Sequence, residues 1–176
     1  IGDHLWMARY LLGRVCEDYG IIVSYAPKMF SDWAGSGAHC NYSTKTMRSG
    51  SKGLKYIHDL IHNFADKHML HCSLYGDDNS KRLTGKHETS SVENFTFGVG
   101  NRAASIRIPT SVAHDDGRGY IEDRRPASNI DPYLVCALMA DTSLLPEDSF
   151  AKGLIGHYER WRQWRENEAE IPRDTV

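Results

Sequence analysis

The stretch GYIEDRRP at Gly119–Pro126 decides how the rest of the chain is interpreted, because it places four charged residues in direct succession. Side chains alternate between the two faces of a strand. We therefore expect Glu122 and Arg124 on one face. Asp123 and Arg125 would then lie on the opposite face. A carboxylate and a guanidinium in one pocket could hold a cation and an anionic group side by side. The alternative is a solvated, self-neutralising strand end.

Two further arginines stand on a neighbouring segment that also reads as a strand. This segment is NRAASIRIP at Asn101–Pro109, and it carries Arg102 and Arg107. Arg82, on a loop, and Arg124 complete a group of four. Guanidinium groups suit the recognition of phosphate or carboxylate. The four arginines therefore indicate an anion-binding pocket if the fold brings them together.

A glycine-rich loop precedes a third strand-like segment. The sequence DWAGSGAHCNYS runs from Asp32 to Ser43 and carries His39 and Asn41 on its expected strand. The GSG at Gly35–Gly37 could let backbone amides approach an anionic ligand. It matches neither a P-loop nor a dinucleotide-binding fingerprint, so it does not identify a phosphate site by itself.

The composition is that of an ordinary globular domain. The chain has 176 residues, of which 40% are hydrophobic and 25% charged, with a net charge of −2. This charge argues against a general nucleic-acid binder. No apolar run approaches the length of a membrane span, and no signal or transit pattern opens the sequence. The four widely spaced cysteines predict free thiols in a reducing compartment, either the cytoplasm or the interior of a mitochondrion or plastid.

Hydrophobic periodicity predicts helices and short strands in alternation. The first helix has Asp3 as its expected N-cap and Gly20 as its stop. The predicted helices span Asp3–Tyr19, Gly53–Lys67 and, from Asp131-Pro132, to about Leu145. The predicted strands, besides the one carrying His39, are Ile21–Tyr25, Leu70–Tyr75, Phe95–Val99, Ala104–Ile108 and Tyr120–Glu122.

Two segments stand apart from this alternation. Gly76–Ser91 is polar and rich in turn residues, which predicts a functional or disordered loop. Leu154–Trp164 has an apolar stripe with interleaved arginines, which predicts a docking helix or a surface for a partner.

Four histidines follow one another on and after the second predicted helix. His58 and His62 are four residues apart, and His68 and His71 follow. A helical pair at this spacing can bind metal, but no third ligand accompanies it. We expect these histidines to decorate an exposed face.

Several motifs occur in the order and spacing of a known family. Read in sequence, they are GDHLW, GSGAHCNYS, DNSKRLTGKHETSS, NRAASIRIP and GYIEDRRPASNIDPY. This order resembles the C-terminal catalytic part of a eukaryotic-type glutamine synthetase. The resemblance covers residues 1–145 and leaves 146–176 as a divergent tail. It implies an α/β (α+β) fold with a curved, mostly antiparallel sheet backed by helices, here missing some strands.

The resemblance also implies an activity. In the family, ATP phosphorylates the γ-carboxylate of glutamate, and ammonia then displaces phosphate to give glutamine, with Mg²⁺ or Mn²⁺ in the site. The implied metal ligands are His39 and Glu122. Implied catalytic residues are Glu88, Arg102 and Arg124, where Glu88 belongs to a closing flap. Implied ATP contacts are Asn41, Tyr42, Ser43, Arg102, Arg107 and Tyr120. Implied glutamate contacts are Asp32, Trp33, Gly35, Arg82 and Arg124.

The sequence departs from the family in informative places. The family's loop usually reads NWNGAGCHTN where this chain has DWAGSGAHCN, so Asp32 and Ala34 replace asparagines. Lys81 stands where arginine is usual. The chain opens at Ile1, after the family's N-terminal β-grasp domain, its E-x-E strand and its GPCEG segment. Most metal-ligating glutamates lie in those parts, so we expect this chain alone to be inactive. The resemblance implies ATP with Mg²⁺ or Mn²⁺, and the alternative is that this truncated chain binds none of them.

Three interpretations remain open from the sequence. The chain is part of a working glutamine synthetase, a homo-oligomer of two stacked pentamer rings that acts on glutamate and ammonia. Alternatively, it is a truncated non-catalytic subunit whose incomplete sheet is covered by other subunits. A nucleotide-binding regulatory remnant is the third. None of these predicts a nucleic-acid or membrane partner.

Overall fold

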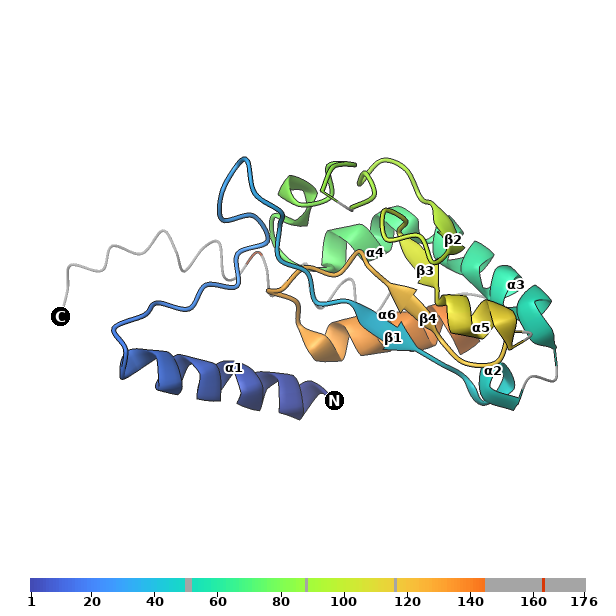
Figure 1. Ribbon diagram of the computed structural model, residues 1–176, viewed down its shortest axis with the longest axis horizontal. Coiled ribbons are helices and arrows are strands. Elements are labelled where there is room, and N and C mark those ends of the chain that lie inside the picture. The colour runs from blue at the N-terminus through green and yellow to red at the C-terminus, as the bar shows by residue number, and fades with distance from the viewer. Residues whose placement is uncertain (50–51, 88, 116, 145–162, 164–176) are drawn as a thin grey trace.

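The computed structural model describes residues 1–49, 52–87, 89–115, 117–144 and 163. Its centre is a sheet of short strands, β1 (Cys40–Tyr42), β2 (Phe97–Val99), β3 (Ile106–Ile108) and β4 (Ile121–Asp123) (Figure 1). The strand order is β1-β4-β3-β2. Strand β4 pairs antiparallel with both β1 and β3, whereas β2 and β3 are parallel. The charged stretch that contains β4 therefore lies in the interior of the sheet.

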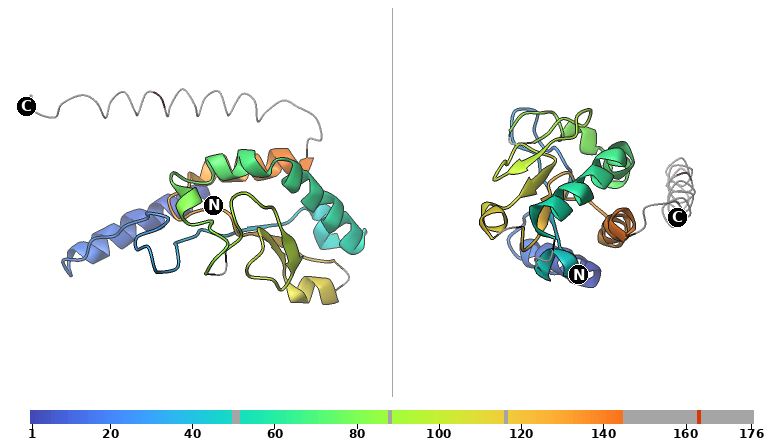
Figure 2. Two further views of the ribbon diagram at one scale, coloured as in Figure 1. Left: turned by 90° about the horizontal axis from the view of Figure 1, so that it is seen from above. Right: turned by 90° about the vertical axis from the view of Figure 1, so that its right-hand side faces the viewer.

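Helices cover one face of this sheet and supply most of the core. In Figure 2, α3 (Gly53–Asp66), α4 (His68–Leu74) and α6 (Pro132–Leu144) lie together on one side, and the short α5 (Thr110–His114) lies on the other. Helix α2 (Lys45–Ser49) and the 3₁₀ turn η1 (Asn79–Lys81) connect these elements. The fully buried core side chains include Ile57, Ile61 and Phe64 of α3, Ile106 and Ile108 of β3, Ile121 of β4, and Val135 and Leu138 of α6.

The α/β class and the mostly antiparallel sheet backed by helices are confirmed. Helix α3 reproduces the predicted helix to within a residue, and strands β2, β3 and β4 fall within or beside the predicted ones. At the start of α6, the Asp131 carboxylate accepts hydrogen bonds from the backbone amides of Tyr133 at 2.9 Å and Leu134 at 3.3 Å. This is N-cap chemistry directly before a first-turn proline.

Helix α1 (Gly2–Glu17) forms where predicted but begins one residue earlier. Asp3 is not its N-cap, because Asp3 already lies in the first turn, where its carboxylate accepts a hydrogen bond from the Tyr133 hydroxyl. Gly20 adopts φ 64°, a left-handed conformation that suits the end of a helix.

Most of α1 is exposed although its sequence is amphipathic. Gly2 is buried against the Tyr133 ring, and Arg9 donates to the carbonyls of Ser128 and Ile130 at 2.7 and 2.9 Å. The exposed apolar side chains are Trp6, Met7, Tyr10, Leu11, Leu12 and Val15, each 47–62% exposed. We call these six residues the α1 apolar face.

Two predicted strands are wrong. Leu70–Tyr75 lies mostly in helix α4, because the run His68, His71, Cys72 and Tyr75 has helical spacing and all four side chains are buried. Ile21–Tyr25 forms no strand. Ile22 is 93% exposed there, so β-branched residues alone did not create a strand without a neighbour to pair with.

The histidine prediction is half right. His58 and His62 are exposed on α3 and contact the Phe97 ring. His68 and His71 are buried, at 6% and 0% exposure, so the expectation of an exposed face is wrong for them. Burial follows from their place on the inner side of α4.

The remaining predictions concern loops and the tail. Residues 76–91 contain the turn η1 and an isolated bridge between Thr84 and Ser91, and Asn79, Arg82 and Leu83 are buried, so the described part of this loop is packed. The predicted helix at Leu154–Trp164 lies outside the described residues, apart from Gln163. Among the described residues, no helix is both long and apolar enough to cross a membrane.

Candidate active site

One row of residues crosses the sheet on the face opposite the large helices. Asn41 of β1 pairs with Glu122 of β4, and Glu122 pairs with Arg107 of β3. Arg107 in turn pairs with Gly98 of β2. Paired residues in neighbouring strands point to the same face. The register therefore places an amide, a carboxylate and a guanidinium side by side.

Glu122 is the centre of an ion-pair cluster. Its Oε1 lies 3.1 Å from His39 Nδ1, and Arg124 Nη1 contacts both carboxylate oxygens at 3.2 Å. Arg107 Nε lies 2.5 Å from Oε2, although its N–H is not aimed along that line. The predicted pairing of Glu122 with Arg124 on one face is thus present, and three cationic or imidazole groups surround one carboxylate.

Arg82 reaches this cluster from the packed loop before β2. Its Nη2 donates to the Arg124 carbonyl at 2.8 Å and lies 3.4 Å from His39 Nε2, while Nη1 donates to the Arg125 carbonyl at 3.0 Å. Its Nε is buried without a hydrogen-bond partner among the described residues. Arg82 therefore fixes the backbone that follows β4 and adds positive charge beside His39.

The charges within the cluster shift the pKa of each titrating group. Burial would raise the pKa of Glu122, but Arg124, Arg107 and His39 outweigh it, so the pKa lies below its ordinary value. Burial, followed by Arg124, lowers the pKa of His39. Glu122 is consequently ionised and His39 neutral at neutral pH.

Positive charge exceeds negative charge at this site. Burial, with a further contribution from Arg124, lowers the pKa of Arg82 to about 10, so its guanidinium still carries its charge at neutral pH. Arg82, Arg107 and Arg124 thus stand against the single carboxylate of Glu122. Such an excess favours binding of an anion such as a phosphoryl or carboxylate group.

The described residues do not make a complete metal site. His39 and Glu122 are two suitable donors, but the Glu122 oxygens already face two guanidinium groups. Across the described ranges, no three His, Cys, Asp or Glu side chains are arranged to hold a metal ion. Divalent cations in phosphoryl-transfer sites need more oxygen ligands than this pair supplies. We therefore derive no step through a metal.

The other predicted residues occupy varied positions. Asn41 faces the cluster, whereas Tyr42 packs toward the Phe64 ring and Tyr120 packs against the core. The Ser43 hydroxyl donates to the Gly119 carbonyl at 2.6 Å. Arg102 is exposed, and its carbonyl accepts a hydrogen bond from Arg124 Nε at 2.8 Å.

The predicted site residues on loops differ in their surroundings. Gly35 packs against Arg82, whereas Asp32 and Trp33 are exposed. Glu88 lies outside the described residues. Its neighbour Thr89 donates from its hydroxyl to the Arg82 carbonyl at 3.1 Å, which ties this part of the loop to the cluster.

Glycine at position 37 is required for Arg82 to reach the cluster. A Cβ there would lie 2.4 Å from Arg82 Nη2 and 3.0 Å from His39 Nε2. We expect Gly37→Ala to displace Arg82 and to reduce the free energy of unfolding by about 1–3 kcal/mol, as overpacking does elsewhere. Urea denaturation measures this. The control is Gly13→Ala in α1, where a Cβ meets nothing within 4 Å, so stability should hold or rise slightly. Equal effects of the two substitutions would contradict the assignment.

A second charged network lies on the opposite face of β4 and was missed at the sequence level. Asp123 and Arg125 are fully buried and form an ion pair at 2.7 Å. The Tyr75 hydroxyl donates to Asp123 at 3.0 Å and lies 2.6 Å from His71 Nδ1, and His71 Nε2 lies 2.8 Å from the Thr142 hydroxyl. The alternation of β4 and the helical spacing of the histidines were the signals that could have revealed it.

Taken together, these residues place three arginines, a histidine and a carboxylate on one face of the sheet of an α/β domain. Residues 1–145 match the family model described as glutamine synthetase, catalytic domain. The chain is 54% identical over 146 residues to a glutamine synthetase of Agaricus bisporus and 56% identical over 143 residues to that of Saccharomyces cerevisiae. The chain belongs to the glutamine synthetase family.

These matches cover most of this chain but less than half of each relative. They include 82% of this chain and 41% of the Agaricus bisporus protein, and 81% and 38% for the Saccharomyces cerevisiae protein. The chain therefore spans about two-fifths of the length of these curated relatives.

Proposed function

We propose that this chain supplies the arginine-lined wall of a glutamine synthetase active site. The parent reaction is the ATP-dependent ligation of ammonia to glutamate through a γ-glutamyl phosphate. The observation that carries the proposal is the pair Arg107 and Arg124 at the Glu122 carboxylate, with Arg82 beside His39 in the same cluster. Family membership supports the reaction class.

Within this proposal, the arginines hold anionic groups in position. Arg107 and Arg124 would contact the transferring phosphoryl group, where fixed positive charge stabilises the negative charge of the transition state. Arg102 would contact phosphate from the loop that Arg124 Nε already holds. Arg82 and the Asp32–Gly35 loop would contact glutamate. Asn41, Tyr42, Ser43 and Tyr120 would border the nucleotide.

Glu122 and His39 would have a second role once further carboxylates complete the site. They would provide two of the ligands for Mg²⁺ or Mn²⁺, which neutralises phosphate charge when bound. Glu88 would close the site and take a proton from ammonium. Closure also excludes water, which would hydrolyse an acyl phosphate.

This chain alone is expected to form no glutamine. Two candidate ligands cannot balance the charges of a multi-cation phosphoryl-transfer site. The measurement is glutamine formation by the purified chain from glutamate, ammonia and ATP with Mg²⁺, with a whole glutamine synthetase as the positive control. Sustained turnover that Glu122→Gln abolishes would overturn this expectation.

A non-catalytic role in a larger assembly is the second candidate function. It is favoured by the α1 apolar face, whose six large side chains are each 47–62% exposed. An apolar surface of this kind usually has a partner. In this role the chain would bind different subunits through its exposed apolar surface. The alternative is that it binds further copies of itself and forms a homo-oligomer. Both assemblies predict that the chain associates, which light scattering of the dilute chain measures. A stable monomer would contradict both of them.

A further inference from the structure

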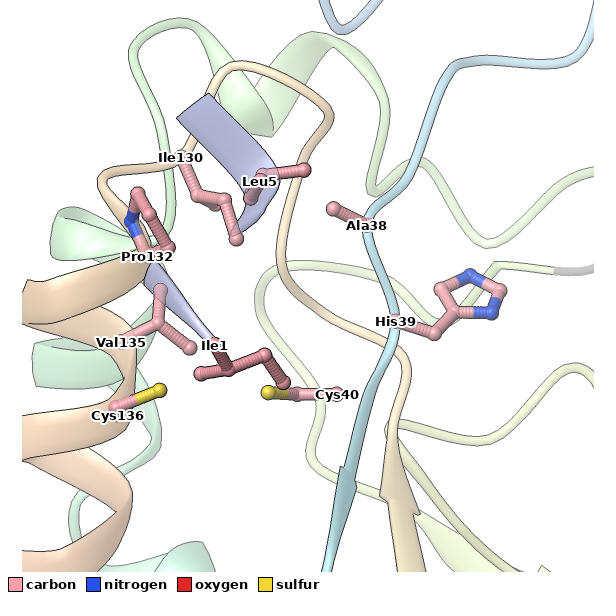
Figure 3. A pocket seen from close by; sticks show the side chains of 9 residues that line it. All are labelled: Ile1, Leu5, Ala38, His39, Cys40, Ile130, Pro132, Val135 and Cys136. Atoms are coloured by element: carbon pink, nitrogen blue, oxygen red, sulfur yellow. The ribbon is translucent and has the colours of Figure 1, made fainter. Parts of the chain in front are cut away.

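An apolar cavity lies behind the wall that carries the candidate active site. It is a partly open pocket with a volume of about 180 Å³, bordered by α1, β1, α6 and the segment before α6. Leu5, Ile130 and Val135 are among its apolar walls (Figure 3). His39 of the Glu122 cluster also lines this pocket, although its imidazole ring points away from the other lining side chains in Figure 3.

Two thiols face this cavity from opposite walls. Cys40 follows His39 at the start of β1, and strand alternation sends its side chain to the helix side of the sheet. Cys136 projects from α6 toward the same space (Figure 3). Both residues are half-buried and neither is in a disulfide. Two distant segments of sequence therefore bring their thiols into one small apolar space.

Ile1 stands between the two sulfurs in the view of Figure 3 but is held there weakly. It is 85% exposed, so little packing energy opposes its movement. Leu5, Ala38, Ile130, Pro132 and Val135 give the space between the two thiols an apolar lining.

We propose that Cys40 and Cys136 form a thiol-pair modification site that a small disulfide oxidant, such as glutathione disulfide, converts to an intramolecular disulfide. One Cys thiolate attacks the oxidant, which forms a mixed disulfide and releases one glutathione thiol. The second Cys thiolate then displaces the other glutathione. Two protein thiols lose two electrons, and the oxidant gains them as two glutathione thiols. The bond joins β1 to α6 directly behind His39.

The test uses the full chain at low concentration, with and without glutathione disulfide. After alkylation of free thiols and proteolysis without reductant, we expect one linked peptide pair containing Cys40 and Cys136. Cys16 and Cys72 should remain alkylated. Oxidation should also raise the melting temperature, because a closed loop restricts the unfolded chain.

Matched variants make the outcome specific. Cys40→Ser and Cys136→Ser should each abolish the linked peptide and the rise in melting temperature, while Cys16→Ser should leave both unchanged. The proposal is overturned if Cys40 and Cys136 are both alkylated after oxidation, or if the links formed are intermolecular or involve Cys16 or Cys72. Peptide mapping of the unsubstituted chain decides this even if a serine variant does not fold.

Discussion

Arg125→Leu is expected to lower the free energy of unfolding by about 3–5 kcal/mol, the usual cost of leaving one buried charge without its partner. Arg125 and Asp123 are both fully buried, and Arg125 donates from Nε at 2.9 Å and from Nη2 at 2.7 Å to the Asp123 carboxylate. Without the guanidinium, the carboxylate would retain the Tyr75 hydroxyl and the backbone amide of residue 125 but no positive charge beside it. A domain of this size has only about 5–15 kcal/mol of stability to lose. Urea denaturation gives the difference directly.

Two comparisons isolate the buried pair. Arg124→Leu changes the adjacent residue on the opposite face, where the side chain is 11% exposed and contacts Glu122, so we expect a smaller loss of stability. Replacing both Asp123 and Arg125 with leucine should recover most of the loss, because no unpaired charge remains. Equal destabilisation by Arg124→Leu and Arg125→Leu would contradict the view that the two faces of β4 differ in this way.

Stability is expected to fall as pH is lowered below about 6.5, and His71 is the main cause. Burial and the nearby Arg125 lower the pKa of His71 to about 3. In the unfolded chain the imidazole binds a proton near pH 6.5. Between these two values the unfolded state binds more protons, so stability decreases by about 1.4 kcal/mol for each unit that pH falls. Urea denaturation at a series of pH values measures the slope.

The source of that slope can be assigned by substitution. His68, whose pKa is also lowered by burial and Arg125, adds to the slope. His71→Gln should reduce the slope above about pH 4.5. In that range Asp123 stays ionised in both states, because its pKa is near 3.9 in the unfolded chain and lower in the folded one. His58→Gln, on the exposed side of α3, should leave the slope unchanged. A slope that survives His71→Gln in full would contradict the assignment.

The sequence predicted the β4 side of the site well because strand alternation is a local rule. Glu122 and Arg124 share one face, and the register adds Asn41 and Arg107 to it. The place of Arg82 could not be predicted in the same way. It depends on how a loop without periodicity packs under Gly37, a contact between distant parts of the chain. Glu88 lies outside the described residues, so its role stays a prediction.

The errors in secondary structure have physical causes. The run at Leu70–Tyr75 is too short for its hydrophobicity alone to distinguish a strand from a helix. Its histidines were expected outside, but buried polar groups satisfy them: Arg125 lies close to both rings, and the Tyr75 and Thr142 hydroxyls contact His71. The sequence predicted helix α1 but not the exposure of its apolar side chains. An amphipathic pattern indicates that a helix has an apolar side, but not which surface covers that side.

We expect residues 1–145 to supply a competent wall of a glutamine synthetase active site. In a chimera that tests this, these residues replace the matching segment of the Saccharomyces cerevisiae enzyme, to which the chain is 56% identical over 143 residues. We expect the chimera to form glutamine and to lose this activity on Arg124→Gln. A chimera that assembles to the same size as its parent, as judged by gel filtration, yet forms no glutamine would contradict the claim and favour the non-catalytic subunit.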